Sequence, residues 1–387
     1  MTGVRRLVIV GGGPAGLAAA RGYRAADGDG AVTLLAGERR PPYQRPPLSK
    51  ELLRGELEPD DVHIEDPGWF AEHDVALRTG ARAAALDPSA RTVLTDDGEP
   101  VPYDALVLAT GAEAAVLPIE GADHPEVLRL RRVEDALRLR ERADPGRRAV
   151  VVGSGFIGCE AAASLAMRGL AVTLVSDEPV PHEARLGAHA GGRIAGWLTE
   201  LGVELRLGTG VELIADGHRV HVPGSAPLEA DLVLVGGGIT PNAQLAAAAG
   251  LPLERGRVVV DEHMRSGRHG ILAAGDVAFA HNAAAGRPLA VEHWGEALNM
   301  GETAGRVAAG EDASWAVAPG FWSTIGTHVL KHAAWGDGHD EARLEDHGGP
   351  FTVWYGRGGI TVGVLAHERD EDYERGRELV ETGAPLP

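Results

Sequence analysis

Uninterrupted apolar runs are spaced along this chain, and two of them lead directly into glycine-rich turns. Residues 7–10 (LVIV) and 149–152 (AVVV) contain no polar position, which predicts strands that are covered on both faces. Each run is followed by glycines spaced G-x-G-x-x-G and then by a small, apolar stretch that predicts a helix. The order strand, glycines, helix is the context that separates this motif from a chance match. The pattern therefore predicts two α/β units of similar design.

The first motif has the chemistry of a dinucleotide site. Gly11 permits a tight turn, Gly13 lets the backbone approach a pyrophosphate, and Gly16 lets the helix pack closely on the strand. The free N–H groups and the positive dipole end of that helix would face the phosphates. Glu38 follows the next predicted strand (32–35) and is placed to accept hydrogen bonds from a ribose. The alternative, a glycine-rich turn without a ligand, is disfavoured by this context.

The second motif, which opens a helix expected to end near Gly169, begins an internal repeat. VTLVSDE at 172–178 matches VTLLAGE at 32–38, and ADLVLVGGG at 230–238 matches YDALVLATG at 103–111. The three matching pieces keep their order and approximate spacing. We therefore predict a second dinucleotide-binding unit like the first.

The first unit is interrupted by the second, because its closing strand is expected at 269–276 (HGILAAGD). The first dinucleotide-binding domain is therefore predicted to be discontinuous, 1–115 and 239–315, with the second domain at 116–238. Prolines near both junctions fit linkers.

Residues 316–387 form a third predicted domain, in which aromatic residues cluster. Residues 351–366 predict a hairpin with a Gly-rich turn, and 368–381 predict a final helix with interspersed charges. The fold class expected is α/β, with two Rossmann-like dinucleotide-binding domains and a small α+β C-terminal domain.

Composition narrows the partners. The 387-residue chain has a formal net charge of −19, which argues against nucleic acid and anionic membranes. No apolar run approaches the length of a membrane span, and glycines break the apolar N-terminus, unlike a signal peptide. Cys159 is the only cysteine, which excludes an internal disulfide and fits a reducing cytoplasm. Monomer and homodimer both remain open.

Two dinucleotide sites in one chain suggest FAD as the fixed cofactor and NAD(P)H as the exchangeable one, with hydride transfer between them. The stretch PPYQRPPLSKELL (41–53) follows Glu38, and its prolines favour an extended path. Arg45 and Lys50 are the strong cations on that path, suited to a pyrophosphate and a reduced flavin. The alternative is a solvated basic loop.

These residues match a known family. The chain resembles the FAD-dependent ferredoxin and rubredoxin reductases, which oxidise NADH for Rieske oxygenases and bacterial cytochromes P450, and it shares elements with apoptosis-inducing factor. The matching pieces run in family order over nearly the whole chain: VIVGGGPAGLAAA, PYQRPPLSK, ALVLATGA, VVVGSGFIGCEAAASL, GGGITPN, LAAGDVA, VEHWGEALNMG and FWS.

The resemblance implies a glutathione-reductase-like architecture, with FAD in the first domain (1–115 and 239–315) and NAD(P)H in the second (116–238). It also implies which positions bind the cofactors. They are Gly11, Gly13, Pro14, Ala15, Gly16, Glu38, Arg45, Lys50, Ala83, Thr110, Gly111, Arg131, Gly153, Gly155, Phe156, Ile157, Gly158, Glu160, Asp177, Gly238, Gly275, Asp276, Glu292, His293 and Trp294. Glu38 would hold the ribose and Ala83 would lie beside the adenine. Arg45 and Arg131 would contact phosphate or the ribityl chain, and Asp276 the ribityl chain.

The same resemblance assigns the reacting end of the site. Trp294 and its neighbours would cap the pyrimidine end of the flavin, and Gly238 and Glu292 would lie near the nicotinamide. Catalytic roles fall on Lys50, beside flavin N5, and on Glu160, its partner. A buried lysine is costly without a carboxylate, so each would stabilise the other, and the positive charge would favour reduced flavin. Without the resemblance, Glu160 could simply stabilise a helix N-terminus.

Two departures from the family bear on specificity. Ser176 replaces the acidic residue that usually ends the second strand of the NAD unit, and Asp177 would take over the ribose from one position on. No arginine follows closely to bind a 2′-phosphate, so NADH is favoured, with NADPH as the alternative. An acidic reductase would also repel acidic ferredoxins at long range unless arginines form a local patch.

The resemblance implies a ferredoxin-type iron–sulfur acceptor. The rival functions are a reductase with another small acceptor and an NADH-binding flavoprotein with a signalling or assembly role, as in apoptosis-inducing factor. Flavin disulfide and peroxide reductases are excluded because they need a redox cysteine beside the flavin, and residues 41–50 hold none. A type II quinone reductase is disfavoured because no predicted helix has the basic amphipathic face that binds a membrane surface. His328 and His332 lack a third ligand, so we predict no metal site.

Overall fold

A computed structural model describes residues 4–387 of the chain, which divide into two compact units. The first unit contains the residues up to Gln44 together with His63–Glu113 and Thr240–Gly320. The second contains Arg45–Val62, Ala114–Ile239 and Phe321–Pro387. The three-domain partition stays a prediction; the second unit combines most of the predicted NAD(P)H and C-terminal domains with the segment Arg45–Val62.

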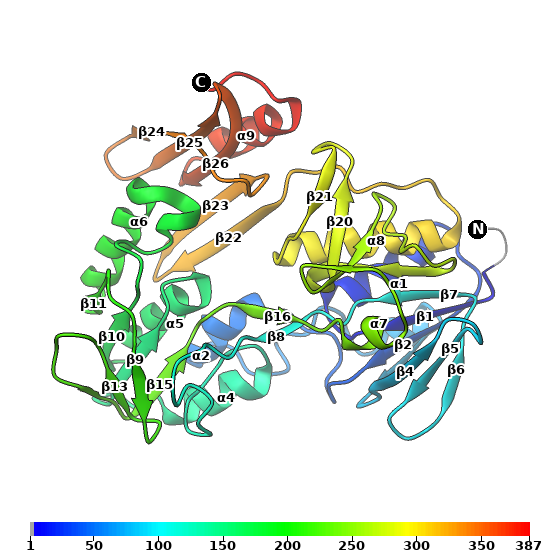
Figure 1. Cartoon of the computed structure of the whole chain (residues 1–387), viewed down its shortest axis with the longest axis horizontal. Helices are drawn as coiled ribbons and strands as arrows, with labels where there is room; N and C mark the ends of the chain where they lie inside the picture. Colours follow the sequence, from blue (N-terminus) through cyan, green and yellow to red (C-terminus); the bar gives the residue numbers. More distant parts are fainter. Residues whose placement is uncertain (1–3) are drawn as a thin grey trace. The chain divides into compact units, whose positions relative to one another are not determined.

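The first unit is built on a parallel sheet in the order β19-β7-β1-β2-β3. Its strands are β1 (Arg6–Val10), β2 (Ala31–Ala36), β3 (Val75–Thr79), β7 (Ala105–Leu108) and β19 (Ile271–Ala273). Figure 1 labels its central strands β7, β1 and β2. All four residues of β7 are buried, as expected for a strand covered on both faces. The prediction that 269–276 closes this sheet is confirmed, since β19 pairs with β7.

Helix α1 (Pro14–Ala25) packs against α8 (Trp294–Ala309) at very short range. A Cβ at Gly301 would overlap the carbonyl oxygen of Ala15, and one at Gly305 would overlap that of Ala19. Glycine is therefore what allows these two helices to approach so closely.

Smaller elements complete the first unit. They are α3 (Trp69–Glu72), β4 (Ala83–Asp87), β5 (Thr92–Thr95), β6 (Pro100–Pro102), α7 (Gln244–Ala248), β17 (Leu253–Glu254), β18 (Arg257–Val260), η2 (Gly275–Val277), β20 (Ala278–Asn282) and β21 (Arg287–Leu289). Strands β4 to β6 form one antiparallel sheet, and β17, β18, β20 and β21 form a mixed one.

The second unit repeats the parallel design, in the order β11-β10-β9-β15. Its strands are β9 (Arg148–Val152), β10 (Ala171–Val175), β11 (Glu204–Arg206) and β15 (Leu232–Val235). Helix α5 (Phe156–Met167) follows β9, and the chain turns at Gly169, where the helix was predicted to end. Apolar side chains of β9 and β15 share a core with β12 (Leu213–Ala215) and β13 (Arg219–His221).

The backbone register confirms the internal repeat. Arg6 pairs with Ala31 in the first sheet, and Arg148 pairs with Ala171 in the second. Leu7 likewise pairs with Ala105, and Ala149 pairs with Leu232. These are the same pairs of positions that the matching sequence pieces bring into correspondence, so the repeat extends to individual strand partners.

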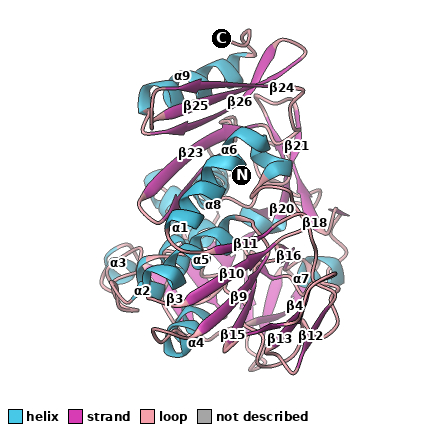
Figure 2. Ribbon diagram, turned by 90° about the vertical axis from the view of Figure 1, so that its left-hand side faces the viewer, coloured by secondary structure: helices cyan, strands magenta, loops and turns pink. Residues whose placement is uncertain are grey.

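The C-terminal part of the second unit is a five-stranded sheet in the order β22-β23-β26-β25-β24, with α9 packed on it (Figure 2). Its elements are β22 (Gly320–Ile325), β23 (His328–Ala334), β24 (Glu341–Asp346), β25 (Phe351–Arg357), β26 (Ile360–His367) and α9 (Asp370–Thr382). The predicted hairpin and final helix are both confirmed. Gly376 lets α9 approach β26, because a Cβ there would overlap Val364.

The remaining elements of the second unit flank these sheets. They are η1 (Pro46–Ser49), α2 (Glu51–Arg54), α4 (Val133–Arg142), α6 (Glu183–Glu200) and β14 (Leu228–Glu229). Strands β8 (Ala112–Ala114) and β16 (Ile239–Pro241) form a two-stranded sheet. Within 4–387, every helix is too short or too polar to cross a bilayer.

Candidate functional site

The glycine loop of the first unit has the geometry of a phosphate cradle. Gly11 has φ +126°, and a Cβ there would overlap the carbonyl of Ala109. A Cβ at Gly16 would overlap the carbonyl oxygen of Gly11, so both positions require glycine. At Gly13, by contrast, an added Cβ would meet no heavy atom within 4 Å. The loop therefore packs tightly against the residue that follows β7 and against the first turn of α1, and it is open at Gly13, where a pyrophosphate would approach.

Other predicted residues of this unit follow the carboxyl ends of neighbouring parallel strands. Thr110 and Gly111 follow β7, where Thr110 Oγ1 donates to the carbonyl of Asn242 at 2.7 Å. Gly275 follows β19 with φ +77°, and a Cβ there would lie 3.1 Å from the Cβ of Ala15. The turn that carries Asp276 therefore lies beside the glycine loop. Ligands of open α/β sheets bind at such strand ends.

The ribose carboxylate predicted from sequence has a partner that was not predicted. Glu38 lies after β2, and the hydroxyl of the buried Tyr43 donates to its Oε2 at 2.6 Å. Ala83 begins β4, opposite Thr95. Both stay predicted contacts of the adenosine end.

Arg257 is a further residue that sequence reasoning missed. It is buried, and its guanidinium donates to the carbonyl oxygen of Asp276 at 3.1 Å and to Glu292 at 2.5 Å. It therefore ties the η2 turn to the segment before α8, whose N-cap is His293 and first residue Trp294. No local motif marks an arginine of this kind in a sequence rich in arginine.

The second glycine loop repeats this geometry. A Cβ at Gly158 would overlap the carbonyl oxygen of Gly153, whereas Gly155 has no heavy atom within 4 Å of an added Cβ. Gly238, with φ +92°, is open in the same sense. Phe156 and Ile157 form the first turn of α5. The second unit therefore also presents a glycine cradle open to a dinucleotide.

The end of β10 separates the two acidic residues that follow it. Asp177 is exposed. Glu178 instead turns back, accepting hydrogen bonds from Ser154 Oγ and from the backbone N–H groups of His182 and Ala184, at 2.9 to 3.1 Å. Asp177 is thus the carboxylate left available for a ribose, and its role stays a prediction.

His182 lies beside the start of α5, where its imidazole packs against the ring of Phe156 at a tilt of 36°, with 4.1 Å between ring centroids. Its Nε2 has no hydrogen-bond partner among residues 4–387. Burial, assisted by the charge of Arg185, lowers the pKa of His182 to about 3. The imidazole is therefore neutral at physiological pH.

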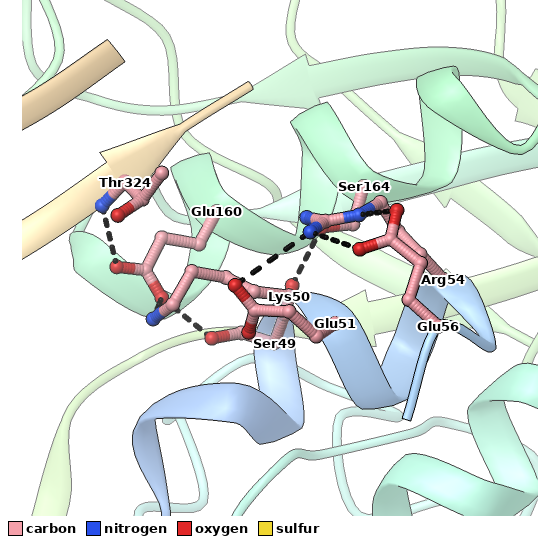
Figure 3. A network of polar contacts seen from close by, with 8 residues as sticks. All are labelled: Ser49, Lys50, Glu51, Arg54, Glu56, Glu160, Ser164 and Thr324. Carbon is pink, nitrogen blue, oxygen red and sulfur yellow. Dashed lines mark hydrogen bonds and ion pairs between the residues drawn. The ribbon is translucent and has the colours of Figure 1, made fainter. Parts of the chain in front are cut away.

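The predicted ion pair between Lys50 and Glu160 is confirmed. Lys50 Nζ lies 2.9 Å from Glu160 Oε2, and the two residues are only 5% and 6% exposed (Figure 3). The alternative of a solvated basic loop is therefore wrong for Lys50. The alternative of a helix N-terminal stabiliser is wrong for Glu160, because its carboxylate binds donors outside α5.

The segment that carries Lys50 is bound firmly to the second unit. Ser164 of α5 donates to the carbonyl of Ser49 at 2.7 Å, and Arg168 donates to the carbonyls of Leu53 and Arg54. Arg45 donates to the carbonyl of Arg131 at 2.5 Å. Arg45 and Arg131 are therefore neighbours, as a shared role in binding a phosphate or the ribityl chain would require. That role stays a prediction.

Cysteine and metal chemistry find little support among the described residues. Burial and the neighbouring Glu160 and Glu178 raise the pKa of the Cys159 thiol well above its usual range, so the reactive thiolate is disfavoured. His328 and His332 lie on β23, where a four-residue separation is about 13 Å, too far to share an ion. Glu345, His347 and Asp372 have metal-like spacing, but Asp372 is already bound by Arg369 and Thr352.

Comparison with known proteins agrees with this geometry. Rhodocoxin reductase of Rhodococcus erythropolis is 33% identical over 386 residues, covering 98% of this chain and 90% of the relative. Putidaredoxin reductase of Pseudomonas putida is 30% identical over 393 residues, covering 98% and 92%. The crystal structure of the covalent putidaredoxin reductase–putidaredoxin complex superposes with a TM-score of 0.92 at 30% identity, over 98% of this chain and 94% of the other.

The family profile described as pyridine nucleotide-disulphide oxidoreductase matches residues 5–301, which include both glycine loops. This match covers far more than half of the chain, and the relatives extend the likeness through the C-terminal sheet. The chain belongs to the pyridine nucleotide-disulphide oxidoreductase family.

Proposed function

We propose that this protein is an FAD-dependent reductase that oxidises NADH and passes single electrons to a ferredoxin-type iron–sulfur protein. The observation that carries the proposal is the pair of open glycine cradles in one chain, supported by relatives over nearly the whole chain that are named rhodocoxin reductase and putidaredoxin reductase. FAD and NADH are the cofactors. When bound, FAD accepts a hydride from NADH and releases electrons one at a time, which couples a two-electron donor to a one-electron acceptor.

The residues of each unit divide the work. In the first unit, the backbone around Gly13 would bind the FAD pyrophosphate, and Glu38, oriented by Tyr43, would hold the ribose. In the second, the backbone around Gly155 would bind NADH. Lys50 would supply a fixed positive charge to the flavin, held in place by Glu160.

The non-catalytic alternative, a flavoprotein that signals or assembles on binding NADH, is not favoured. Curated relatives that span nearly the whole chain are named as reductases of rhodocoxin and putidaredoxin. The raised thiol pKa of Cys159, the only cysteine, also disfavours a cysteine-based disulfide or peroxide reductase. The same lone cysteine supports a cytoplasmic location.

The test is NADH-driven reduction of a [2Fe–2S] ferredoxin by the purified holoprotein, followed by the visible spectrum of the ferredoxin under anaerobic conditions. We expect bound FAD, rapid bleaching of the flavin by NADH, and multiple turnovers of the ferredoxin. Protein that takes up no FAD, or flavin that NADH and NADPH fail to bleach, would overturn the proposal. Rapid bleaching with slow transfer to every iron–sulfur acceptor would favour the signalling alternative instead.

Coenzyme choice can be tested at Asp177. Replacing it with Asn should lower kcat/KM for NADH about tenfold, since a hydrogen bond to a charged group contributes about 1.5 kcal/mol or more, with little effect on NADPH. Asp177→Glu keeps the charge and should retain the preference for NADH. A wild-type kcat/KM higher for NADPH than for NADH would contradict the assignment.

A further inference from the structure

The carboxylate of Glu160 is shared between two separate elements of the second unit. Its Oε2 accepts hydrogen bonds from Ser49 Oγ at 2.5 Å and Lys50 Nζ at 2.9 Å. Its Oε1 accepts from Ser323 Oγ at 2.8 Å and from the backbone N–H of Thr324 at 3.3 Å. Figure 3 shows Glu160 between Lys50 on one side and Thr324 on the other. One oxygen thus faces the lysine segment, and the other faces strand β22.

Strand alternation explains why Ser323 reaches this carboxylate. Phe321, Ser323 and Ile325 are buried, whereas Trp322 between them is 45% exposed. Consecutive side chains of a strand point to opposite faces, so Ser323 points inward with the apolar residues. Its side chain is 1% exposed, and a hydroxyl in such a place must hydrogen-bond.

The four donors use the full hydrogen-bonding capacity of a carboxylate. The terminal torsion of a glutamate has a broad, roughly two-fold preference and is not fixed by the side chain itself. Donors on Oε1 are therefore what fixes the plane of the carboxylate, and that plane decides where Oε2 holds the ammonium group. Lys50 and Ser49 lie on a single segment and cannot set this orientation alone.

We propose that Ser323 is a positioning residue for Lys50, acting through Glu160. The C-terminal sheet then contributes to the active site by fixing the direction of the Lys50 charge, rather than by touching Lys50. The inference rests on the proposed function, in which that charge serves the flavin. If the hydrogen bond from Ser323 to Glu160 did no more than give the buried Ser323 hydroxyl a partner, removing that hydroxyl would leave the position of Lys50 unchanged.

The chain offers an uncommon direct probe, because Lys50 and Lys331 are its only lysines. Holoprotein labelled with ¹³C-lysine should give two ε-methylene signals, with Lys331, 38% exposed and paired with Asp370, as the internal reference. Ser323→Ala should shift and broaden the Lys50 signal and leave that of Lys331 in place. It should also slow flavin reduction by NADH about fivefold or more and shift the flavin midpoint potential downward.

Two control variants separate positioning from general damage. Ser323→Thr keeps the hydroxyl and should behave as the wild type. Thr324→Val keeps the backbone N–H that Glu160 uses and removes only a hydroxyl outside this network, so it should also leave both readouts unchanged. In a Glu160→Gln background, Ser323→Ala should add little further effect, because residues that act through one group are not additive.

Several outcomes would overturn the inference. One is an unchanged Lys50 signal and midpoint potential in Ser323→Ala; another is an equal loss in Thr324→Val or an undiminished extra loss in the Glu160→Gln background. If Ser323→Ala fails to fold, Ser323→Cys, with its weaker donor, replaces it and should show a partial shift of the Lys50 signal; no shift would overturn the inference. Failure of the proposed function looks different: NADH would not reduce even the wild-type flavin, whatever the lysine signals showed.

Discussion

The two glycine loops share a scaffold but differ in what their helices bury. Helix α1 buries alanine, glycine, leucine and tyrosine, and packs on α8 through backbone contacts that glycine makes room for. Helix α5 has the same position relative to its sheet, yet it buries Glu160 and Ser164, and both bind the segment that carries Ser49 and Lys50.

This difference teaches how a repeated unit acquires separate tasks. The strand registers and glycine turns decide where a phosphate can approach, and they are the same in both units. What differs is that α5 carries two buried polar residues, Glu160 and Ser164, which hold the segment with Lys50. Helix α1 buries no polar residue of this kind. A binding scaffold and a reactive group are thus distinct layers of the design, which mutation can separate.

The largest expected effects remove the scaffold itself. Gly16→Ala would place a Cβ on the carbonyl oxygen of Gly11, and Gly158→Ala would place one on that of Gly153. We expect Gly16→Ala to abolish FAD retention and Gly158→Ala to abolish NADH binding, measured by flavin absorbance and by calorimetry. Gly192→Ala, in an open position of α6, is the control and should leave both unchanged. If Gly158→Ala released FAD while Gly16→Ala retained it, the assignment of the two loops would be reversed.

The next largest effect is expected from variants that remove the charge of Lys50 and leave the glycine loops intact. Lys50→Ala leaves the buried Glu160 charge uncompensated, which typically costs about 3–5 kcal/mol of unfolding free energy. It should also weaken FAD retention or slow flavin reduction by NADH in stopped-flow measurements. Lys331→Ala breaks an exposed pair, worth about 1 kcal/mol or less. Unchanged flavin content and reduction rate in Lys50→Ala would remove this lysine from the mechanism.

A pH effect of intermediate size should arise in the second unit from His182. Because burial lowers its pKa to about 3 from the ordinary 6.5, the folded state favours the neutral imidazole. The effect of His182 on the free energy of unfolding is therefore constant above pH 6.5. Below pH 6.5 the free energy of unfolding falls by about 1.4 kcal/mol per pH unit, because the unfolded chain binds a proton that the folded state does not. Denaturation at several pH values should show this slope.

His182→Asn supplies the matched control for that slope. His182 has φ +59°, a conformation that Asn tolerates better than most residues. The variant should lose the part of the acid sensitivity between pH 6.5 and 4 that belongs to this imidazole. An identical pH dependence in the variant and the wild type would show that other groups cause it.

Sequence alone predicted the strands, the glycine turns and the internal repeat, because each of these leaves a local pattern along the chain. The apolar runs 7–10 and 149–152 became β1 and β9, and the matching pieces of the repeat anticipated which residues pair across the sheets. The Lys50–Glu160 pair was reached only through the family resemblance. Ser323 and Arg257 were missed, because contacts between residues far apart in the chain leave no local periodicity. The attachment of Arg45–Val62 to the second unit was missed for the same reason.

The smallest predicted effect concerns the first unit, where the hydroxyl of Tyr43 orients the carboxylate of Glu38. Tyr43→Phe removes the hydroxyl that donates to Glu38 at 2.6 Å and leaves the ring in its buried place. A hydrogen bond to a charged group contributes about 1.5 kcal/mol, so FAD should bind about tenfold more weakly in titrations of the apoprotein. Because Tyr43 acts on the ribose end, the rate at which NADH reduces bound flavin should not change. A slower reduction rate with unaltered FAD affinity would show that the two layers are coupled in this unit, and the contrast with α5 would no longer hold.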